Sequence, residues 1–195
     1  MESILEIAEK NNGVVSAGMV QESGIPNYYL GKLVKAGVLE KLSRGLYSKE
    51  EAYIDEMYDL QMSYSNLIFS HLSALYIHNL TDRTPLKMTV TVPKDQNVSK
   101  LIKSDLAVVK RSNASNHSLG VCEKRSPGGF LIKVYDKERT ICDIVKAREK
   151  MDSQVFTDAL KAYAKDKEKD LTKLMEYAKI LKVEKLVRQY MEVLL

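Results

Sequence analysis

The first 50 residues constrain the fold most, because glycine and proline divide them into short segments that end in a basic hairpin. Apolar residues between Ile4 and Val15, interrupted by a turn at residues 11–13, predict a short amphipathic helix closed by that turn. Ser16 is suited to cap a second helix, which Gly24 ends. The chain therefore begins as a small helical domain.

A third helix and a hairpin follow the turn at Ile25 and Pro26. Between Asn27 and Gly37 the apolar residues have helical spacing, and Gly37 ends the run. Residues 38–42 and 46–48 are suited to strands and flank Ser43-Arg44-Gly45, which predicts a hairpin with glycine at the turn. Three helices and a basic hairpin are the elements of a winged helix-turn-helix.

The charge of this region has a strong local bias, although the whole chain carries only +4. Residues 1–26 are acidic on balance. Between residues 27 and 49 the sign reverses, and Glu40 is the only acidic residue among the basic ones, which are Lys32, Lys35, Lys41, Arg44 and Lys49. A local positive field of this kind attracts phosphate.

Duplex DNA is therefore the expected partner of this domain. A helix fits the major groove, and basic side chains hold its register on the backbone while polar side chains read base edges. The residues expected to contact DNA are Asn27, Tyr28, Lys32 and Lys35 on the helix and Lys41, Ser43 and Arg44 on the wing. Tyr29 and Tyr47 fall on apolar positions and are expected to be core or partly buried core residues. The alternative is a solvated face that binds another protein.

The rest of the chain indicates a mixed α/β domain. We expect helices around residues 55–65 and over 72–80, a half-buried strand at 88–92 and a second strand at 106–110. A turn at residues 126–129 separates the strands of an antiparallel hairpin, 119–124 and 130–135, and Asp136 is suited to cap the first helix of a helical last third. The predicted fold is α+β, with a winged domain at residues 1–50 and an α/β domain at 51–195, whose small sheet is mainly antiparallel.

Few residues suggest catalysis or metal binding. His71 and His78 lie two helical turns apart near Asp82, but we expect them to line a junction between helix and sheet, bonded to the backbone. Arg139 and Asp143 have the spacing of a structural ion pair. Cys122 and Cys142 lie in apolar patterns typical of reduced, buried thiols and lack zinc-ligand spacing, so we expect no metal, cofactor or catalytic residue.

The composition of the chain indicates where the protein is located. The acidic N-terminus is unlike a signal peptide and no run of residues is apolar enough for a membrane span, so we expect a cytoplasmic protein.

The middle of the chain, residues 87–133, is also basic. This surface either extends the DNA footprint, faces RNA or is simply solvated.

Four blocks of the sequence resemble the AbiEi-type antitoxins. The run from Gly37 to Tyr47 is similar to the end of their winged domain, and the resemblance continues through residues 70–82, 89–93 and 136–143 in the same order. Two positions depart from the usual pattern: Leu46 stands where valine is more usual, and Asn79 stands where glycine often precedes Leu-Thr. The blocks extend over most of the chain.

The resemblance implies a two-part protein of a type IV toxin–antitoxin, abortive-infection operon. The winged domain would repress its own promoter by binding inverted repeats, and the C-terminal domain would counteract a nucleotidyltransferase-like toxin without forming a stable complex with it. No long heptad seam is present, so we expect a monomer in solution and two copies on DNA. The alternatives are a nucleic-acid-processing enzyme delivered by a winged domain, and an adaptor that binds protein.

Overall fold

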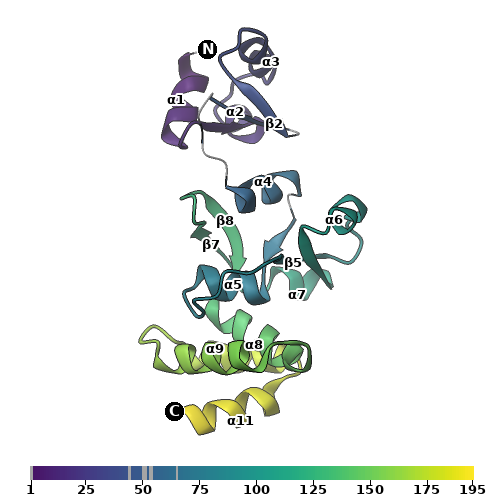
Figure 1. The fold of residues 1–195 in the computed structure, drawn as a ribbon, viewed down its shortest axis with the longest axis vertical. Coiled ribbons are helices and arrows are strands. Elements are labelled where there is room, and N and C mark those ends of the chain that lie inside the picture. The colour runs from purple at the N-terminus through teal and green to yellow at the C-terminus, as the bar shows by residue number, and fades with distance from the viewer. Residues whose placement is uncertain (1, 44, 50–51, 53–54, 65) are drawn as a thin grey trace. The chain divides into compact units, whose positions relative to one another are not determined.

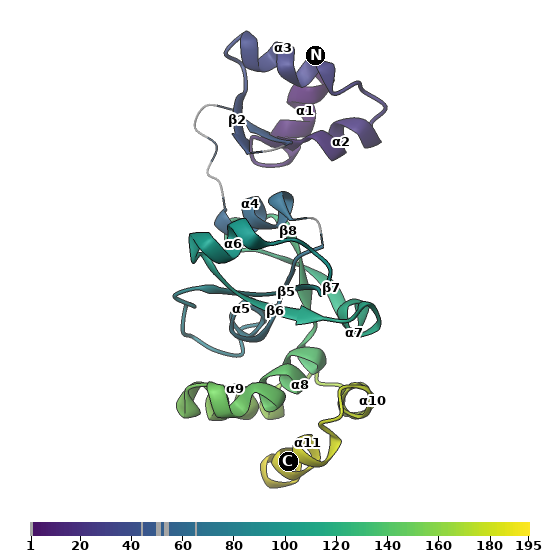
Figure 2. The same ribbon diagram turned by 90° about the vertical axis from the view of Figure 1, so that its right-hand side faces the viewer.

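The computed structural model describes residues 2–43, 45–49, 52, 55–64 and 66–195. The chain divides into two compact units, one made of residues 1–65 and 125–132 and the other of residues 66–124 and 133–195. Figures 1 and 2 show the elements of each unit. The domain boundary at residue 50 stays a prediction.

The N-terminal unit begins with the winged helix-turn-helix elements, as predicted. Their order is α1 (Glu2–Lys10), β1 (Val14–Ser16), α2 (Ala17–Glu22), α3 (Tyr28–Lys35), β2 (Glu40–Ser43) and β3 (Leu46–Ser48). The three strands form an antiparallel sheet in the order β1-β3-β2. The hairpin of β2 and β3 is the wing, and α2 and α3 are the helix-turn-helix.

Local signals and a small core explain these elements. The Ser16 hydroxyl accepts a hydrogen bond from the Met19 amide and so caps α2. Gly37, at φ +70°, lets the chain leave α3, and the Val38 amide bonds back to the Leu33 carbonyl. Buried Ile4, Ala8, Val15, Val20, Leu30, Leu33 and Leu39 form the core.

Strand β1 was not predicted from the sequence. Val14 and Val15 pair with Ser48 and Tyr47 of β3, more than 30 residues away along the chain. Both valines are buried. A three-residue segment shows no periodicity of its own, so only the distant partner strand defines it as β-structure.

The N-terminal unit also contains α4 (Glu56–Ser63) and the segment of residues 125–132. Asp55 is 5% exposed, and its carboxylate accepts hydrogen bonds from the amides of Met57 and Gly128 at 2.7 and 2.8 Å. The Tyr58 and Phe130 rings stack with their centroids 4.5 Å apart. These contacts join two segments that are distant in sequence.

A five-stranded mixed sheet organises the second unit. Its order is β6-β5-β4-β8-β7, made of β4 (Ile68–Phe69), β5 (Met88–Pro93), β6 (Ala107–Ser112), β7 (Val121–Arg125) and β8 (Leu131–Tyr135). The predicted α+β class is confirmed, but β5 pairs with β6, and β4 with β8, in parallel rather than in a mainly antiparallel sheet. Parallel neighbours need a crossover connection, and α6 (Ser99–Ser104) lies in the one between β5 and β6.

The prediction that the strand at residues 88–92 is half-buried was wrong. Thr89 and Thr91 are each only 4% exposed, because α5 (His71–Ile77) covers that face. The Ser73 hydroxyl accepts from the Thr89 amide, and the Thr91 hydroxyl donates to Ser70. The threonine side chain carries a polar hydroxyl, but a buried hydroxyl is tolerated when it is hydrogen-bonded, as that of Thr91 is.

Helices form the rest of the second unit. After the short α7 (Ala114–Ser118), these are α8 (Lys137–Ala147), a 3₁₀ turn (Arg148–Lys150), α9 (Ser153–Lys165), α10 (Leu171–Ile180) and α11 (Glu184–Leu194). Asp136, Asp152 and Asp170 cap α8, α9 and α10 through their side chains, which confirms the predicted role of Asp136. Figure 1 shows α8 beside α9, and the buried face of α8 supplies Ile141, Cys142, Ile144 and Val145 to the shared core.

Candidate nucleic-acid interface

Asn27 stands at the position that precedes the first turn of α3. An asparagine there usually caps the helix, but the Asn27 side chain makes no capping hydrogen bond and is exposed. Its amide is therefore available to an external partner. An asparagine amide can donate to and accept from the edge of adenine at the same time.

Tyr28, Tyr29 and Lys32 form one exposed aromatic and cationic surface on α3. The two rings meet edge to face with centroids 5.7 Å apart. The Lys32 ammonium lies 4.9 Å from the Tyr28 ring centroid and 5.8 Å from that of Tyr29. Since Tyr28 is 68% exposed, the rings and the charge together present a face suited to stacking and to phosphate.

Tyr47 is partly buried against the core, as expected, but the same prediction of a core or partly buried position was wrong for Tyr29. Tyr29 is 37% exposed, whereas its neighbour Leu30 is fully buried. Leu30 and Leu33 already provide the apolar face of this helix, so the ring of Tyr29 lies at the edge of that face. Tyr29 is thus an interface candidate that the sequence pattern did not identify.

Gly31 is an exposed residue of α3 that precedes Lys32 in the sequence. No atom lies within 4 Å of a Cβ placed on Gly31, so the fold does not require glycine there. Lys35 is also exposed, in the last turn of the helix. A glycine without a structural reason is consistent with a partner that approaches the helix backbone closely.

Replacing Gly31 with alanine is expected to stabilise the protein. An exposed helical alanine is favoured over glycine by about 1 kcal/mol, and the site is free of steric conflict. Urea denaturation followed by circular dichroism measures the change. A loss of stability would show that the backbone at residue 31 is not the regular helix described.

The wing presents Lys41 to solvent, opposite Tyr47 in the strand register. The register shifts between Lys41 and Ser43, and Gly45 adopts φ +80° beside the turn. Arg44 and the side chain of Ser43 lie outside the described residues, so their DNA contacts stay predictions. The Lys49 ammonium lies 2.7 Å from a carboxylate oxygen of Glu9, and this ion pair lowers the pKa of Glu9.

His71 and His78, the candidate catalytic residues of the enzyme alternative, have different surroundings in the structure. The His78 Nε2 atom lies 2.7 Å from the Tyr135 carbonyl and the ring is 8% exposed, which confirms the expected bond to the backbone. Asp82 lines a separate pocket. His71 instead approaches the Ser70 hydroxyl at 3.1 Å and lines a cleft of its own.

Two other sequence expectations concern buried groups in the second unit. Arg139 and Asp143 form the predicted ion pair at 3.1 Å. Cys142 is buried as expected, and burial raises the pKa of its thiol to about 12, whereas Cys122 is only half-buried. Among the described residues, no group of three or more His, Cys, Asp and Glu side chains could hold a metal ion.

Residues 2–48 have the order of helices and strands that is typical of a winged helix-turn-helix. Residues 2–48 match the model of the family described as "Transcriptional regulator, AbiEi antitoxin". This match includes the run from Gly37 to Tyr47 in which the sequence resembles the AbiEi-type antitoxins, and it supports a role in regulation and antitoxicity.

Other comparisons add little to this assignment. The crystal structure of the RV2827C protein from Mycobacterium tuberculosis is similar with a TM-score of 0.45 and 12% sequence identity, over 97% of this chain and 79% of that chain. No curated protein matches the sequence. In the described part of the chain, no helix has both the length and the apolar character to cross a bilayer.

Proposed function

We propose that this protein is a cytoplasmic, type IV antitoxin that represses its own promoter. The winged domain binds inverted repeats in duplex DNA, with one monomer on each repeat. The C-terminal domain counteracts a nucleotidyltransferase-like toxin, without a stable complex between the two proteins. The family match over residues 2–48 supports the regulatory and antitoxin parts of this proposal.

The exposed surface of α3 is the observation that carries DNA binding. It combines an asparagine amide that makes no capping hydrogen bond, two exposed tyrosines and the exposed cations Lys32 and Lys35. Such a surface supplies base-edge, stacking and phosphate contacts on one helix. The exposed Lys41 adds a backbone contact from the wing.

A band-shift titration on the DNA upstream of the gene tests the promoter interaction. We expect specific binding in two steps, one for each repeat, with affinity that falls steeply as salt rises. Unrelated duplex of equal length and composition serves as competitor. Equal affinity for both duplexes would contradict the repressor function.

Removing wing charges is expected to flatten the salt dependence. Lys41→Ala and Arg44→Ala should each reduce the slope of log affinity against log salt concentration by about 0.9. A complex with one phosphate contact fewer releases fewer counterions when it forms, so its affinity depends less on salt. Fluorescence anisotropy over a salt series gives this slope. An unchanged slope would remove the wing from the contact surface.

Antitoxicity is tested by co-expression with the nucleotidyltransferase-like toxin. Growth should be rescued by the full chain and also by the wing variants, since the proposal assigns the two activities to different domains. Size-exclusion chromatography should show separate peaks for the two proteins. Loss of rescue in the wing variants would show that the winged domain also takes part in neutralisation.

A further inference from the structure

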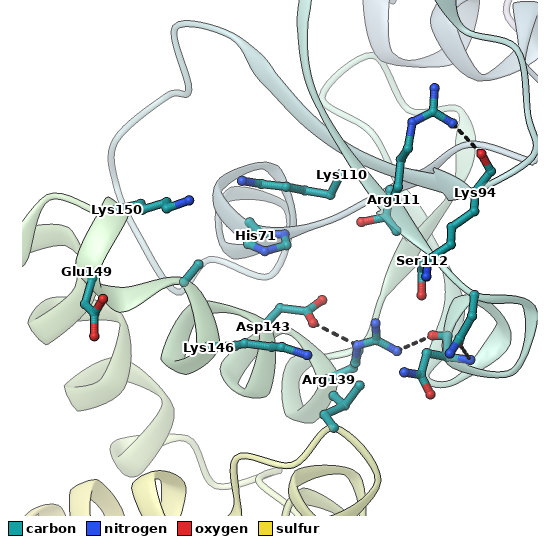
Figure 3. A pocket seen from close by; sticks show the side chains of 15 residues that line it. His71, Lys94, Lys110, Arg111, Ser112, Arg139, Asp143, Lys146, Glu149 and Lys150 are labelled. Atoms are coloured by element: carbon teal, nitrogen blue, oxygen red, sulfur yellow. Dashed lines mark hydrogen bonds and ion pairs between the residues drawn. The ribbon is translucent and has the colours of Figure 1, made fainter.

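A basic cleft of about 510 Å³ lies within the second unit, and residues of that unit alone line it. It is lined by residues from α5, β5, β6, α7, α8 and the 3₁₀ turn after α8. Figure 3 shows the side chains that converge on it. Its volume lies within the range of roughly 300–1,000 Å³ that is typical of sites for small ligands.

Positive charge in this cleft is not neutralised by the protein. Lys94, Lys110, Lys146 and Lys150 line it, and none has an ion-pair partner among the described residues. The two carboxylates of the lining are bound to arginines, Glu149 to Arg148 at 3.0 Å and Asp143 to Arg139 at 3.1 Å.

Arg111 adds a further cation that is fixed in position. Its guanidinium donates hydrogen bonds to the carbonyls of Lys94 and Gln96 at 2.8 and 3.1 Å. These neutral acceptors orient the group and leave its charge uncompensated. Like charges brought together repel each other, so a bound anion would relieve the repulsion and gain from every cation in the cleft.

A buried acceptor without a partner lies in the same cleft. The Asp143 side chain is only 8% exposed, and its Oδ2 atom has no hydrogen-bond partner among the described residues, although Oδ1 accepts from Arg139. Figure 3 shows Asp143 between His71 and Arg139, with its carboxylate on the side of Arg139. A buried unsatisfied oxygen is costly unless a donor reaches it.

His71 lies beside this carboxylate as a neutral ring. Burial lowers the pKa of the imidazole below its ordinary value, and the charge of Asp143 only partly opposes this effect. The Lys110 and Arg139 cations lower the pKa further. The interior of the cleft therefore combines a flat neutral ring with an acceptor, whereas the surrounding lysines are cationic.

We propose that this cleft binds a nucleotide, with its phosphates on Lys94, Lys110, Arg111, Lys146 and Lys150 and a hydroxyl or amino donor of its nucleoside on the Asp143 Oδ2 atom. The phosphates supply the missing negative charge, and the nucleoside supplies the missing donor. Inorganic phosphate satisfies only the first requirement. The nucleotide is either free or the terminal residue of an RNA strand. This site does not depend on promoter binding by the winged domain.

Equilibrium binding to the full-length protein tests the proposal with three probes: ATP, a 5′-phosphorylated single-stranded RNA of six nucleotides, and inorganic tripolyphosphate. Lys110→Glu and Lys146→Glu should each weaken binding of the preferred nucleotide probe at least about 10-fold, as expected for the loss of a charge-assisted contact. Lys161→Glu, an exposed lysine of α9 outside the cleft, is the matched control and should leave affinity unchanged.

Asp143→Asn tests the nucleoside contact separately from the phosphate contacts. It should alter affinity for ATP or RNA several-fold but leave tripolyphosphate binding within about two-fold, once thermal melting shows that the variant is folded. Tighter binding of ATP than of RNA identifies a free nucleotide, and the reverse identifies a strand end. The Lys32→Glu variant should retain nucleotide binding even where promoter binding is lost.

Three results would overturn the nucleotide site. The first is equal affinity of the lysine variants, the Lys161→Glu control and the unmodified protein for every probe. The second is a loss confined to duplex DNA in the lysine variants, which would make the cleft part of the DNA footprint. The third is an unchanged affinity of Asp143→Asn for both nucleotide probes, which would leave a simple polyphosphate site.

Discussion

Arg139→Ala is expected to lower the free energy of unfolding by about 3–5 kcal/mol, the usual cost of breaking a buried ion pair from one side. The Arg139 side chain is 4% exposed and holds the Asp143 carboxylate at 3.1 Å. Its guanidinium also donates to the carbonyls of Asn116 and Leu119 and lies 4.2 Å from the centroid of the Tyr135 ring. The substitution leaves a buried carboxylate and two carbonyls without this donor.

Urea denaturation followed by circular dichroism measures this loss. Arg148→Ala is the matched control, because Arg148 pairs with the 81%-exposed Glu149, and a pair so open to solvent contributes at most about 1 kcal/mol. The Arg139→Met/Asp143→Leu double variant should recover part of the loss, since it removes both charges together. Similar small losses for Arg139→Ala and the control would show that the buried pair is not a principal contributor to stability.

Reversing the charge of α3 should abolish most promoter binding. We expect the Lys32→Glu/Lys35→Glu variant to bind the operator at least about 100-fold more weakly, because two phosphate contacts are lost and two repulsive charges are introduced. The change also removes the ammonium that lies over the Tyr28 and Tyr29 rings. A band shift at fixed salt concentration gives the affinity.

Lys10→Glu is the control for this charge reversal. Lys10 is exposed in the last turn of α1, in the same unit but on a different helix. It should reduce affinity only slightly, through the change in net charge. The single variant Lys32→Glu reverses the same number of charges as Lys10→Glu. If these two single variants weaken binding equally, the interaction is a general attraction to the unit and α3 is not the recognition helix.

Local signals made the winged domain predictable from its sequence. Helix caps and turns depend on side chains only a few residues apart, such as Ser16 with the Met19 amide and Asp136 with the Arg139 amide. The hairpin of the wing is likewise specified by its own turn. Features that depend on distant partners were missed: β1 requires β3, and the parallel pairing of β5 and β6 requires α6 as a crossover.

The interface residues were predictable only in part, for a similar reason. Lys32 and Lys35 are exposed because the apolar positions of α3 determine which face is buried. Tyr29 lies at the border of that face, where periodicity does not decide between core and surface. The basic cleft was not predictable as one site, because its lysines at positions 94, 110, 146 and 150 meet only when strands and helices far apart in sequence are assembled.

The segment of residues 125–132 limits how a chimaera with a new N-terminal unit can be made. Since this segment belongs with residues 1–65, the chain passes between the units at three places, after residues 65, 124 and 132. A gene fusion that exchanged only the first 65 codons would replace Asp55 and Tyr58 but keep Gly128 and Phe130, their partners. New regulatory specificity is therefore better grafted as surface changes on α3 and the wing than as an exchanged N-terminal cassette.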